Sequence, residues 1–187
     1  MEQIRPTWDE YFMLLAKLAA LRSTCIARPV GAVIVKDRHV LATGYNGSPP
    51  GAPHCIDVGY CMKSRLRGDG SGAYDTCRAS HAEANAIAHA SRHGVSVAGA
   101  TIYTTLSPCY TCAKLLASAG IQSVFYETRH TSDDEALDRI WMDAIQEAGM
   151  RAQQLSVPEP MLKRAAELLS GPTSLRRELD EAGCLVR

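Results

Sequence analysis

The second half of the chain alternates strand-like and helix-like segments, and this alternation constrains the fold more than any other feature. The strand-like segments are ATIYTTLS (100–107), SVFYE (123–127) and RAQQLSV (151–157), and the helical ones cover 110–119 and 133–149. Each helical segment is long enough to carry the chain back across a sheet, so successive strands can pair in parallel. Right-handed connections then place helices on both faces. The pattern predicts an α/β fold, a three-layer α/β/α sandwich.

The first half adds a helix and a hairpin. Residues 7–22 begin with Thr7 as an N-cap and acidic residues in the first turn, followed by apolar residues at the spacing of an amphipathic helix (Tyr11, Leu14, Leu15, Leu18 and Leu21). VGAVIVKDRHVLATGYNG then contains two β-rich runs around Lys36–Arg38, which is typical of an antiparallel hairpin. With the three later strands, this hairpin predicts a mixed five-stranded sheet. Another helix is expected from Ala82 to His93.

Residues 47–80 are rich in Gly, Pro and Cys and have little periodicity. An unstructured loop of this length is uncommon in a compact domain unless something ties it down. We expect one domain over residues 1–158 that contains this insertion. A C-terminal helical extension and tail then covers 159–187, beginning with the helical segment EPMLKRAAELL.

Composition excludes several classes of function. The chain has 187 residues, 46% of them hydrophobic, which is enough for one core. Its 20 Lys and Arg residues balance 20 Asp and Glu residues, so the chain has no net positive charge that would attract a nucleic-acid backbone. No stretch approaches the length of an apolar membrane span, and MEQIRPTWDE lacks the order of a secretory signal. We expect a cytoplasmic protein without nucleic-acid or membrane partners, whose cysteines are ligands or buried thiols.

Two short motifs together indicate a metal centre. SHAEANAIAHA (80–90) places His81 at the start of an alanine-rich helix, and SPCYTCAK (107–114) places Cys109 and Cys112 where a strand ends and a helix begins. Alone, the histidine is typical of a surface or core position, and Cys-x-x-Cys of a structural zinc or redox site. Combined, they supply three ligands, and a tetrahedral Zn²⁺ with three protein ligands keeps one position for water, as catalytic sites do. We predict that the two helix starts face each other at the carboxyl ends of the strands.

Glu83 lies two residues after His81 and is the predicted proton carrier. Zinc lowers the pKa of bound water toward neutrality, so a nearby carboxylate can take its proton and later deliver protons to a ring nitrogen and a departing amine. This chemistry is hydrolytic deamination of an amidine-like carbon. His-x-Glu with Pro-Cys-x-x-Cys is the signature of zinc nucleobase deaminases.

Five segments resemble the deoxycytidylate (dCMP) deaminase family of the cytidine deaminase superfamily. They are VGAVIV, GYNGSPPG, CRASHAEANAI, GATIYTTLSPCYTCAKLLASAGI and VFYE, and the resemblance runs from about Trp8 to Ala148. The Gly-Tyr-Asn-Gly-x-Pro segment before a cysteine separates this branch from the free-cytidine and tRNA-adenosine branches. The resemblance implies a cytidine deaminase-like fold and a CMP/dCMP-type deaminase domain over 1–158. It also implies hydrolysis of dCMP to dUMP and ammonia, which supplies thymidylate synthesis.

The same resemblance implies roles for individual residues. His81, Cys109 and Cys112 would hold the catalytic zinc, and Glu83 would move protons. Asn46 would contact the nucleotide sugar, although an asparagine before Gly47 can also serve only the turn. The family further implies a homohexamer that is activated by dCTP and inhibited by dTTP, with Mg²⁺ accompanying the effector nucleotide.

Two further residues are predicted to contact substrate. Arg28 precedes PVGAV and is a candidate phosphate ligand, because a guanidinium matches phosphate oxygens in bidentate geometry; the alternative is a solvated surface arginine. Shortly after VFYE the family presents a tyrosine that stacks on cytosine, and the matching position here is His130. An imidazole can also stack on a base. The alternative for 129–134 is a solvated loop.

Four further cysteines have an expected use. The resemblance implies a second, structural zinc in the insertion, for which Cys25, Cys55, Cys61 and Cys77 would form a closed Cys₄ site. Such a site would link the insertion to the rest of the domain through the metal. The alternative is a set of buried thiols. His54 is a reserve ligand, and Cys184 is expected to be free.

Two other functions compete with dCMP deamination. One is a related zinc deaminase that acts on a modified cytosine nucleotide, a free nucleoside or a base in tRNA, although the chain shows no basic stripe with aromatic residues for tRNA. The other is a catalytically silent zinc protein that binds nucleotides or a partner protein, for instance in DNA uptake. Glu83 argues against a silent site, which has no use for an unligated carboxylate beside the metal.

Overall fold

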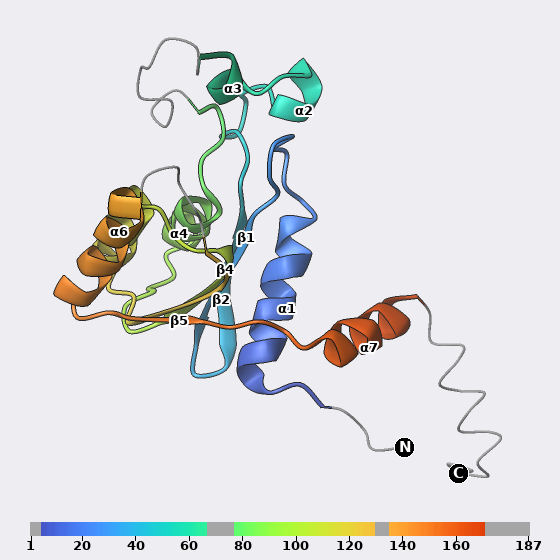
Figure 1. The fold of residues 1–187 in the computed structure, drawn as a ribbon, viewed down its shortest axis with the longest axis vertical. Helices are drawn as coiled ribbons and strands as arrows, with labels where there is room; N and C mark the ends of the chain where they lie inside the picture. The colour runs from blue at the N-terminus through green and yellow to red at the C-terminus, as the bar shows by residue number, and fades with distance from the viewer. Residues whose placement is uncertain (1–4, 67–76, 130–134, 171–187) are drawn as a thin grey trace. The chain divides into compact units, whose positions relative to one another are not determined.

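The computed structural model describes residues 5–66, 77–129 and 135–170 (Figure 1). Residues 7–156 pack as one unit, and the C-terminal helix belongs to a second unit. That helix, α7 (Glu159–Leu169), follows Pro158 and carries Pro160 in its first turn, where a missing N–H costs nothing. None of the helices in these ranges has the length and apolar character needed to cross a membrane. The predicted extension over 159–187 stays a prediction as a whole, because its last residues lie outside the described ranges.

Five strands form one sheet in the order β2-β1-β3-β4-β5. The strands are β1 (Gly31–Lys36), β2 (His39–Tyr45), β3 (Thr101–Leu106), β4 (Ser123–Thr128) and β5 (Arg151–Gln154). Strand β1 pairs antiparallel with both β2 and β3, whereas β3, β4 and β5 run parallel. The prediction of an α/β fold with a mixed five-stranded sheet is confirmed. Because β2, β3 and β4 point the same way, their carboxyl ends lie at one edge of the sheet.

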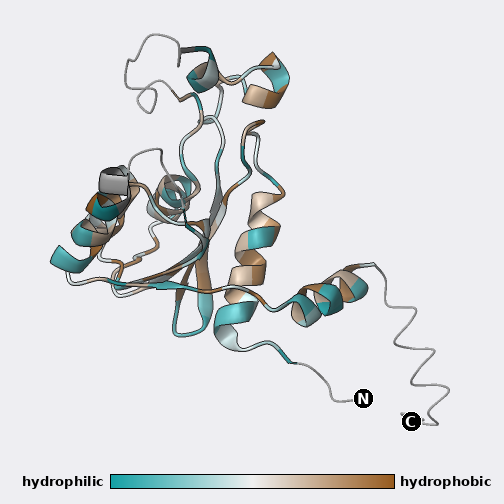
Figure 2. Ribbon diagram, viewed as in Figure 1, coloured by the Kyte–Doolittle hydropathy of each residue, from teal (hydrophilic) through white to brown (hydrophobic). Residues whose placement is uncertain are grey.

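Helices cover both faces of this sheet. They are α1 (Trp8–Ala20), α4 (Ala82–Arg92), α5 (Tyr110–Ser118) and α6 (Glu135–Glu147). Figure 1 shows α1 on one face and α4 and α6 on the other. Ala32 and Ile34 of β1 share a buried core with α4, α5 and α6, whereas Val33 between them points to the face that α1 covers. Figure 2 shows hydrophobic residues concentrated in these central strands.

Helix α1 begins as predicted but buries a different face. The Thr7 side chain accepts a hydrogen bond from the Glu10 N–H (3.2 Å), and the Glu10 carboxylate accepts one from the Thr7 N–H (2.7 Å), which completes a capping box. The residues that pack on the sheet are Phe12, Met13 and Ala16. The apolar residues singled out from the sequence mostly face outward, and Leu21 is 80% exposed.

The insertion contains two short helices that periodicity does not predict, α2 (Cys55–Val58) and α3 (Met62–Leu66). Its ends are tied together, because Gly47 and Ser80 exchange backbone hydrogen bonds of 3.2 and 3.0 Å. The chain therefore leaves the sheet after β2 and returns at the same point, directly before His81.

Strand β2 approaches the start of α4 very closely at Gly44. A Cβ atom at this position would lie 2.2 Å from the Ala82 carbonyl oxygen and 2.5 Å from the Ala86 nitrogen. Only glycine permits this distance, so the first turn of α4 rests directly on the backbone of β2. The sheet thereby positions His81 and Glu83.

Candidate active site

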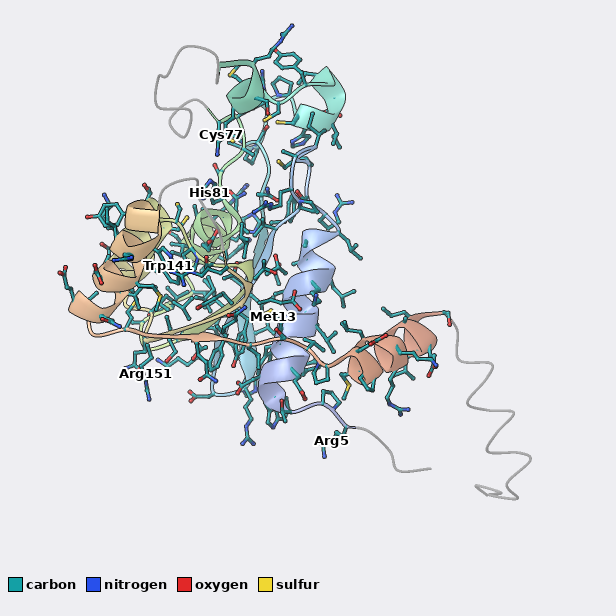
Figure 3. All side chains as sticks on the ribbon, in the orientation of Figure 1. Arg5, Met13, Cys77, His81, Trp141 and Arg151 are labelled. Carbon is teal, nitrogen blue, oxygen red and sulfur yellow. The ribbon has the colours of Figure 1, made fainter. Side chains whose placement is uncertain are left out.

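His81 and Cys109 occupy equivalent positions at the starts of two helices. His81 is the N-cap of α4 and Cys109 is the N-cap of α5, each with an extended backbone. Cys112 follows in the first turn of α5 and is buried. The prediction that the two helix starts face each other at the carboxyl edge of the sheet is confirmed. His81 and the first turns of α4 lie at that edge in Figure 3.

The three side chains meet at the spacing of a tetrahedral metal site. The His81 Nδ1 atom lies 3.5 Å from the Cys109 sulfur and 3.4 Å from the Cys112 sulfur. Typical zinc bonds of about 2.3 Å to sulfur and about 2.0–2.1 Å to nitrogen place two tetrahedral ligands about 3.5 Å apart. Across the described ranges, this is the one set of three or more metal-binding side chains whose ligand atoms all lie within 4.8 Å of each other. The residues present therefore fit one zinc ion.

Hydrogen bonds within this set shift the ionisation of its members. The Cys112 thiol donates to Cys109 and lowers the pKa of Cys109 to about 4, and His81 adds to the effect. The same bond, together with burial, raises the pKa of Cys112. The hydrogen bond between His81 and Cys109 raises the pKa of His81. A divalent metal would replace these shared protons, because a coordinating thiol is deprotonated outright.

Glu83 supplies a buried carboxyl group beside the metal-binding set. It is 3% exposed and lies in the first turn of α4. Burial raises the pKa of Glu83, and nearby His81 opposes that rise. The carboxylate hydrogen-bonds with Cys112. A carboxyl group with a raised pKa can accept and return a proton near neutral pH, which is what acid–base catalysis requires.

Asn85 holds the start of α4 in place, and the sequence analysis missed it. Its side-chain N–H donates to the Tyr45 carbonyl oxygen (2.7 Å), and its backbone N–H donates to the His81 carbonyl oxygen (3.0 Å). The side-chain bond links α4 to the end of β2. Asn85 is a single amide side chain in an alanine-rich helical segment, and this pattern could have predicted that it bonds to a neighbouring element.

Asn46 joins three segments near the site. Its Oδ1 atom accepts from the Ser23 hydroxyl (2.6 Å) and from the Val30 N–H (2.8 Å), and its amide nitrogen donates to the Arg28 carbonyl oxygen (2.8 Å). The amide oxygen is thus fully used, and one N–H remains. A contact from Asn46 to a sugar stays a prediction, and this N–H would have to make it.

The other predicted substrate contacts have different outcomes. Arg28 is exposed and lines a cavity at the carboxyl ends of β3 and β4. Its role toward phosphate stays a prediction. His130 lies outside the described residues.

The four remaining described cysteines come from the helix α1 end and the insertion. Cys55 is buried, and the other three, Cys25, Cys61 and Cys77, are half-buried. Burial raises the pKa of Cys55, and the proximity of the other three sulfurs raises it further. Within the part of the chain that the structure describes, these sulfurs do not form a set as tight as the His81 centre. Cys184 lies outside that part.

Three buried polar atoms near these cysteines have no hydrogen-bond partner among the residues that the structure describes. They are the Thr24 hydroxyl oxygen, the His54 Nδ1 atom and the Arg78 Nε atom, and each residue is adjacent in sequence to one of the cysteines. In native proteins, buried polar atoms are rarely left without a hydrogen-bond partner.

Comparison with known proteins agrees with this geometry. The family described as the cytidine and deoxycytidylate deaminase zinc-binding region matches residues 6–128. The deoxycytidylate deaminase of Mycobacterium phage D29 is 47% identical over 124 residues, which cover 65% of this chain and 95% of that protein. ComE operon protein 2 of Bacillus subtilis is 38% identical over 185 residues, or 98% of this chain and 89% of that protein. The chain spans 47% of the length of two yeast deoxycytidylate deaminases that it also matches.

A solved structure is similar as well. The dCMP deaminase of cyanophage S-TIM5, in complex with dCMP and dUMP, has a TM-score of 0.62 and 27% sequence identity, covering 82% of this chain and 100% of that one. The family match over residues 6–128 includes all three residues of the metal centre and Glu83. The chain belongs to the deoxycytidylate deaminase family, within the cytidine and deoxycytidylate deaminase zinc-binding superfamily.

Proposed function

We propose that this protein is a zinc-dependent hydrolase that converts dCMP and water to dUMP and ammonia, and so supplies dUMP for thymidylate synthesis. One observation carries the proposal: a buried carboxyl group, Glu83, lies against a His-Cys-Cys set with the spacing of a zinc site. A structural site would have no use for that acid. The family to which the chain belongs supplies the substrate class.

His81, Cys109 and Cys112 would hold the zinc ion. Bound there, zinc supplies the Lewis acidity that makes water nucleophilic near neutral pH. With three protein ligands, the centre would keep one position for water. The two helix N-termini stabilise the thiolates of the cysteines, because the positive end of each helix dipole points toward them.

Glu83 would carry the protons of the reaction. Its carboxylate takes a proton from the attacking water as the new C4–O bond of the pyrimidine forms, and delivers it to ring nitrogen N3. Glu83 then takes the remaining proton from the hydroxyl on C4 and delivers it to the exocyclic amine, so the C4=O bond forms, the C4–N bond breaks and ammonia leaves. Burial favours the neutral form of Glu83, which makes it a proton donor at the second step.

Substrate contacts extend from this centre. Asn46 would use its remaining amide N–H toward the sugar, and Arg28 would bind phosphate. His130, at the position where the family has tyrosine, would stack on the pyrimidine. Because an imidazole replaces the phenol ring of tyrosine at this position, the preferred cytosine substrate can differ from dCMP, and other cytosine substrates should be tested beside it.

We also propose a second, structural zinc bound by Cys25, Cys55, Cys61 and Cys77. The support is that Cys25, Cys61 and Cys77 each raise the pKa of Cys55, and that three buried polar atoms beside these cysteines lack hydrogen-bond partners among the described residues. His54 is the alternative fourth ligand, because its buried Nδ1 atom, next to Cys55, has no hydrogen-bond partner within the described ranges. Closing such a site would tie α2 and α3 to the end of α1.

Family membership supports three further proposals about the working enzyme. It would act in the cytoplasm as a homohexamer. It would be activated by dCTP and inhibited by dTTP, with Mg²⁺ accompanying the effector. The observed balance of acidic and basic residues fits a small nucleotide as the ligand better than a nucleic acid.

A substrate panel tests the proposed reaction. Ammonia release is measured with dCMP, CMP, dCTP, deoxycytidine and 5-methyl-dCMP, and dCMP is expected to have the highest kcat/KM. Faster turnover of the 5-methyl nucleotide or of the nucleoside would favour a related deaminase. A zinc-loaded protein that releases no ammonia from any of the five would refute the enzymatic function.

Substituting the proton carrier separates catalysis from metal binding. Glu83→Gln should retain zinc and lower kcat at least about a thousandfold, because the amide cannot accept the proton from water. Glu147→Gln, at an exposed position at the end of α6, is the matched control and should keep full activity. Zinc content is measured by atomic absorption. Near-normal turnover by zinc-loaded Glu83→Gln would show that another group moves the protons.

Metal counting tests the second zinc. The protein should bind two zinc ions per chain, Cys112→Ser should lose the catalytic one, and Cys55→Ser should lose only the other. Cys55→Ser should also unfold at a lower temperature, because structural zinc contributes to folding stability. One zinc ion per chain, unaffected by Cys55→Ser, would exclude the Cys₄ site.

A further inference from the structure

Helix α4 turns one face toward strand β2. Residues at positions i, i+3, i+4 and i+7 share a helix face, and on this face of α4 they are Ala82, Asn85, Ala86 and His89. The side chains of Ala82 and Ala86 are fully buried. A Cβ atom on Gly44 would lie 2.5 Å from the Ala86 nitrogen. The apolar part of this contact is therefore alanine against glycine.

Two polar side chains on the same face bond to the backbone of β2. The Asn85 side-chain N–H donates to the Tyr45 carbonyl oxygen (2.7 Å), and the His89 Nδ1–H donates to the Thr43 carbonyl oxygen (3.0 Å). The two acceptors lie on either side of Gly44. An alanine surface on a glycine backbone has no large side chains to interlock, so it fixes the rotation of a helix poorly. Hydrogen bonds have a preferred direction, and these two set the position of α4 on the strand.

The Asn85 bond reaches the segment that would contact the nucleotide. Its acceptor belongs to the peptide unit between Tyr45 and Asn46. This unit is planar, and its N–H, which comes from Asn46, donates to the Val30 carbonyl oxygen (3.1 Å). The His89 bond ends two residues farther back along β2. Asn85 thus bonds the first turns of α4 directly to the peptide that carries Asn46.

We infer that Asn85 is a positioning residue, whose side-chain bond to β2 fixes where His81 and Glu83 lie relative to the bound nucleotide. The inference rests on the proposed function for the roles of Glu83 and Asn46. Asn85 lies about one helical turn after His81, so a rotation of α4 that follows its loss displaces both functional side chains. A displacement of about 1 Å between reacting groups can lower a rate about a hundredfold.

The first test compares turnover with binding in Asn85→Ala. The kcat for dCMP, measured with saturating zinc, should fall at least about tenfold, because Glu83 and the metal centre no longer align with the pyrimidine. The Kd of dUMP, measured by calorimetry, should change less than about threefold, because Asn46 keeps its bonds to Ser23 and Val30. A fall in kcat of less than about threefold would overturn the inference, and so would equal changes in kcat and Kd.

His89→Ala is the matched control. This variant removes the other side-chain bond between α4 and β2, on the same helix face but one turn farther from His81. It should keep kcat within about twofold of the unmodified enzyme, because the bond to the peptide that carries Asn46 remains. A fall equal to that of Asn85→Ala would mean that any loosening of α4 lowers the rate, and the specific role of Asn85 would be wrong.

A conservative variant separates positioning from folding. Asn85→Gln keeps the amide donor but places it one methylene farther from the backbone, so its kcat should lie between those of the unmodified protein and Asn85→Ala. Thermal unfolding of Asn85→Ala should shift by only about 2–4 °C, because one hydrogen bond is lost. If Asn85→Ala does not fold, Asn85→Gln takes its place, and a folded Asn85→Gln with unchanged kcat would overturn the inference.

Zinc affinity gives a measurement that does not depend on turnover. Competition with a chromogenic chelator should show that Asn85→Ala binds the catalytic zinc about tenfold more weakly, because His81 is no longer held in place, whereas His89→Ala is unchanged. Cys112→Ser, which lacks the catalytic site, gives the contribution of any other zinc. An unchanged affinity in Asn85→Ala would overturn the inference.

The two proposals can fail separately. If the protein deaminates none of the five cytosine substrates but Asn85→Ala shows the loss of zinc affinity, the proposed function fails and the positioning role stands. If dCMP is deaminated and Asn85→Ala keeps both kcat and zinc affinity, the positioning role fails alone.

Discussion

The approach of the His81 nitrogen to two cysteine sulfurs, at 3.4 and 3.5 Å, is the interaction on which the rest of this structure depends. The two helices that carry these residues start at one edge of the sheet because β2 and β3 end there. Gly44 lets α4 rest on the backbone of β2, and Asn85 bonds α4 to the end of that strand. The sheet thus sets the distance between the ligands, and it places Glu83 beside them.

The sequence carried enough information to predict the fold class and the metal centre. Alternating segments beyond residue 100 indicated parallel strands with helices between them, because backbone pairing leaves few other arrangements. The metal centre was predictable because its chemistry requires particular residue types at helix starts, and His81, Cys109 and Cys112 are such residues. Both signals are local, and the topology that unites them follows from general rules of chain connection.

Other features depend on contacts between distant segments and could not be read from local pattern. The buried face of α1 is Phe12, Met13 and Ala16, although a second apolar stripe on the same helix had the same periodicity. The bonds of Asn46 to Ser23 and Val30 likewise join residues far apart in sequence. The cavity at the carboxyl ends of β3 and β4 is a third case, because Arg28 and Arg129 line it from segments far apart in sequence.

The central claim is that one zinc ion is held by three protein ligands beside an unligated acid. Diffraction data collected on crystals of the zinc-loaded protein at the zinc absorption edge test it most directly. The account predicts an anomalous peak bonded to the His81 Nδ1 atom and to the sulfurs of Cys109 and Cys112, with Glu83 near but not bonded to the metal. A fourth protein ligand on that ion, whether Glu83 or another side chain, would contradict a catalytic centre.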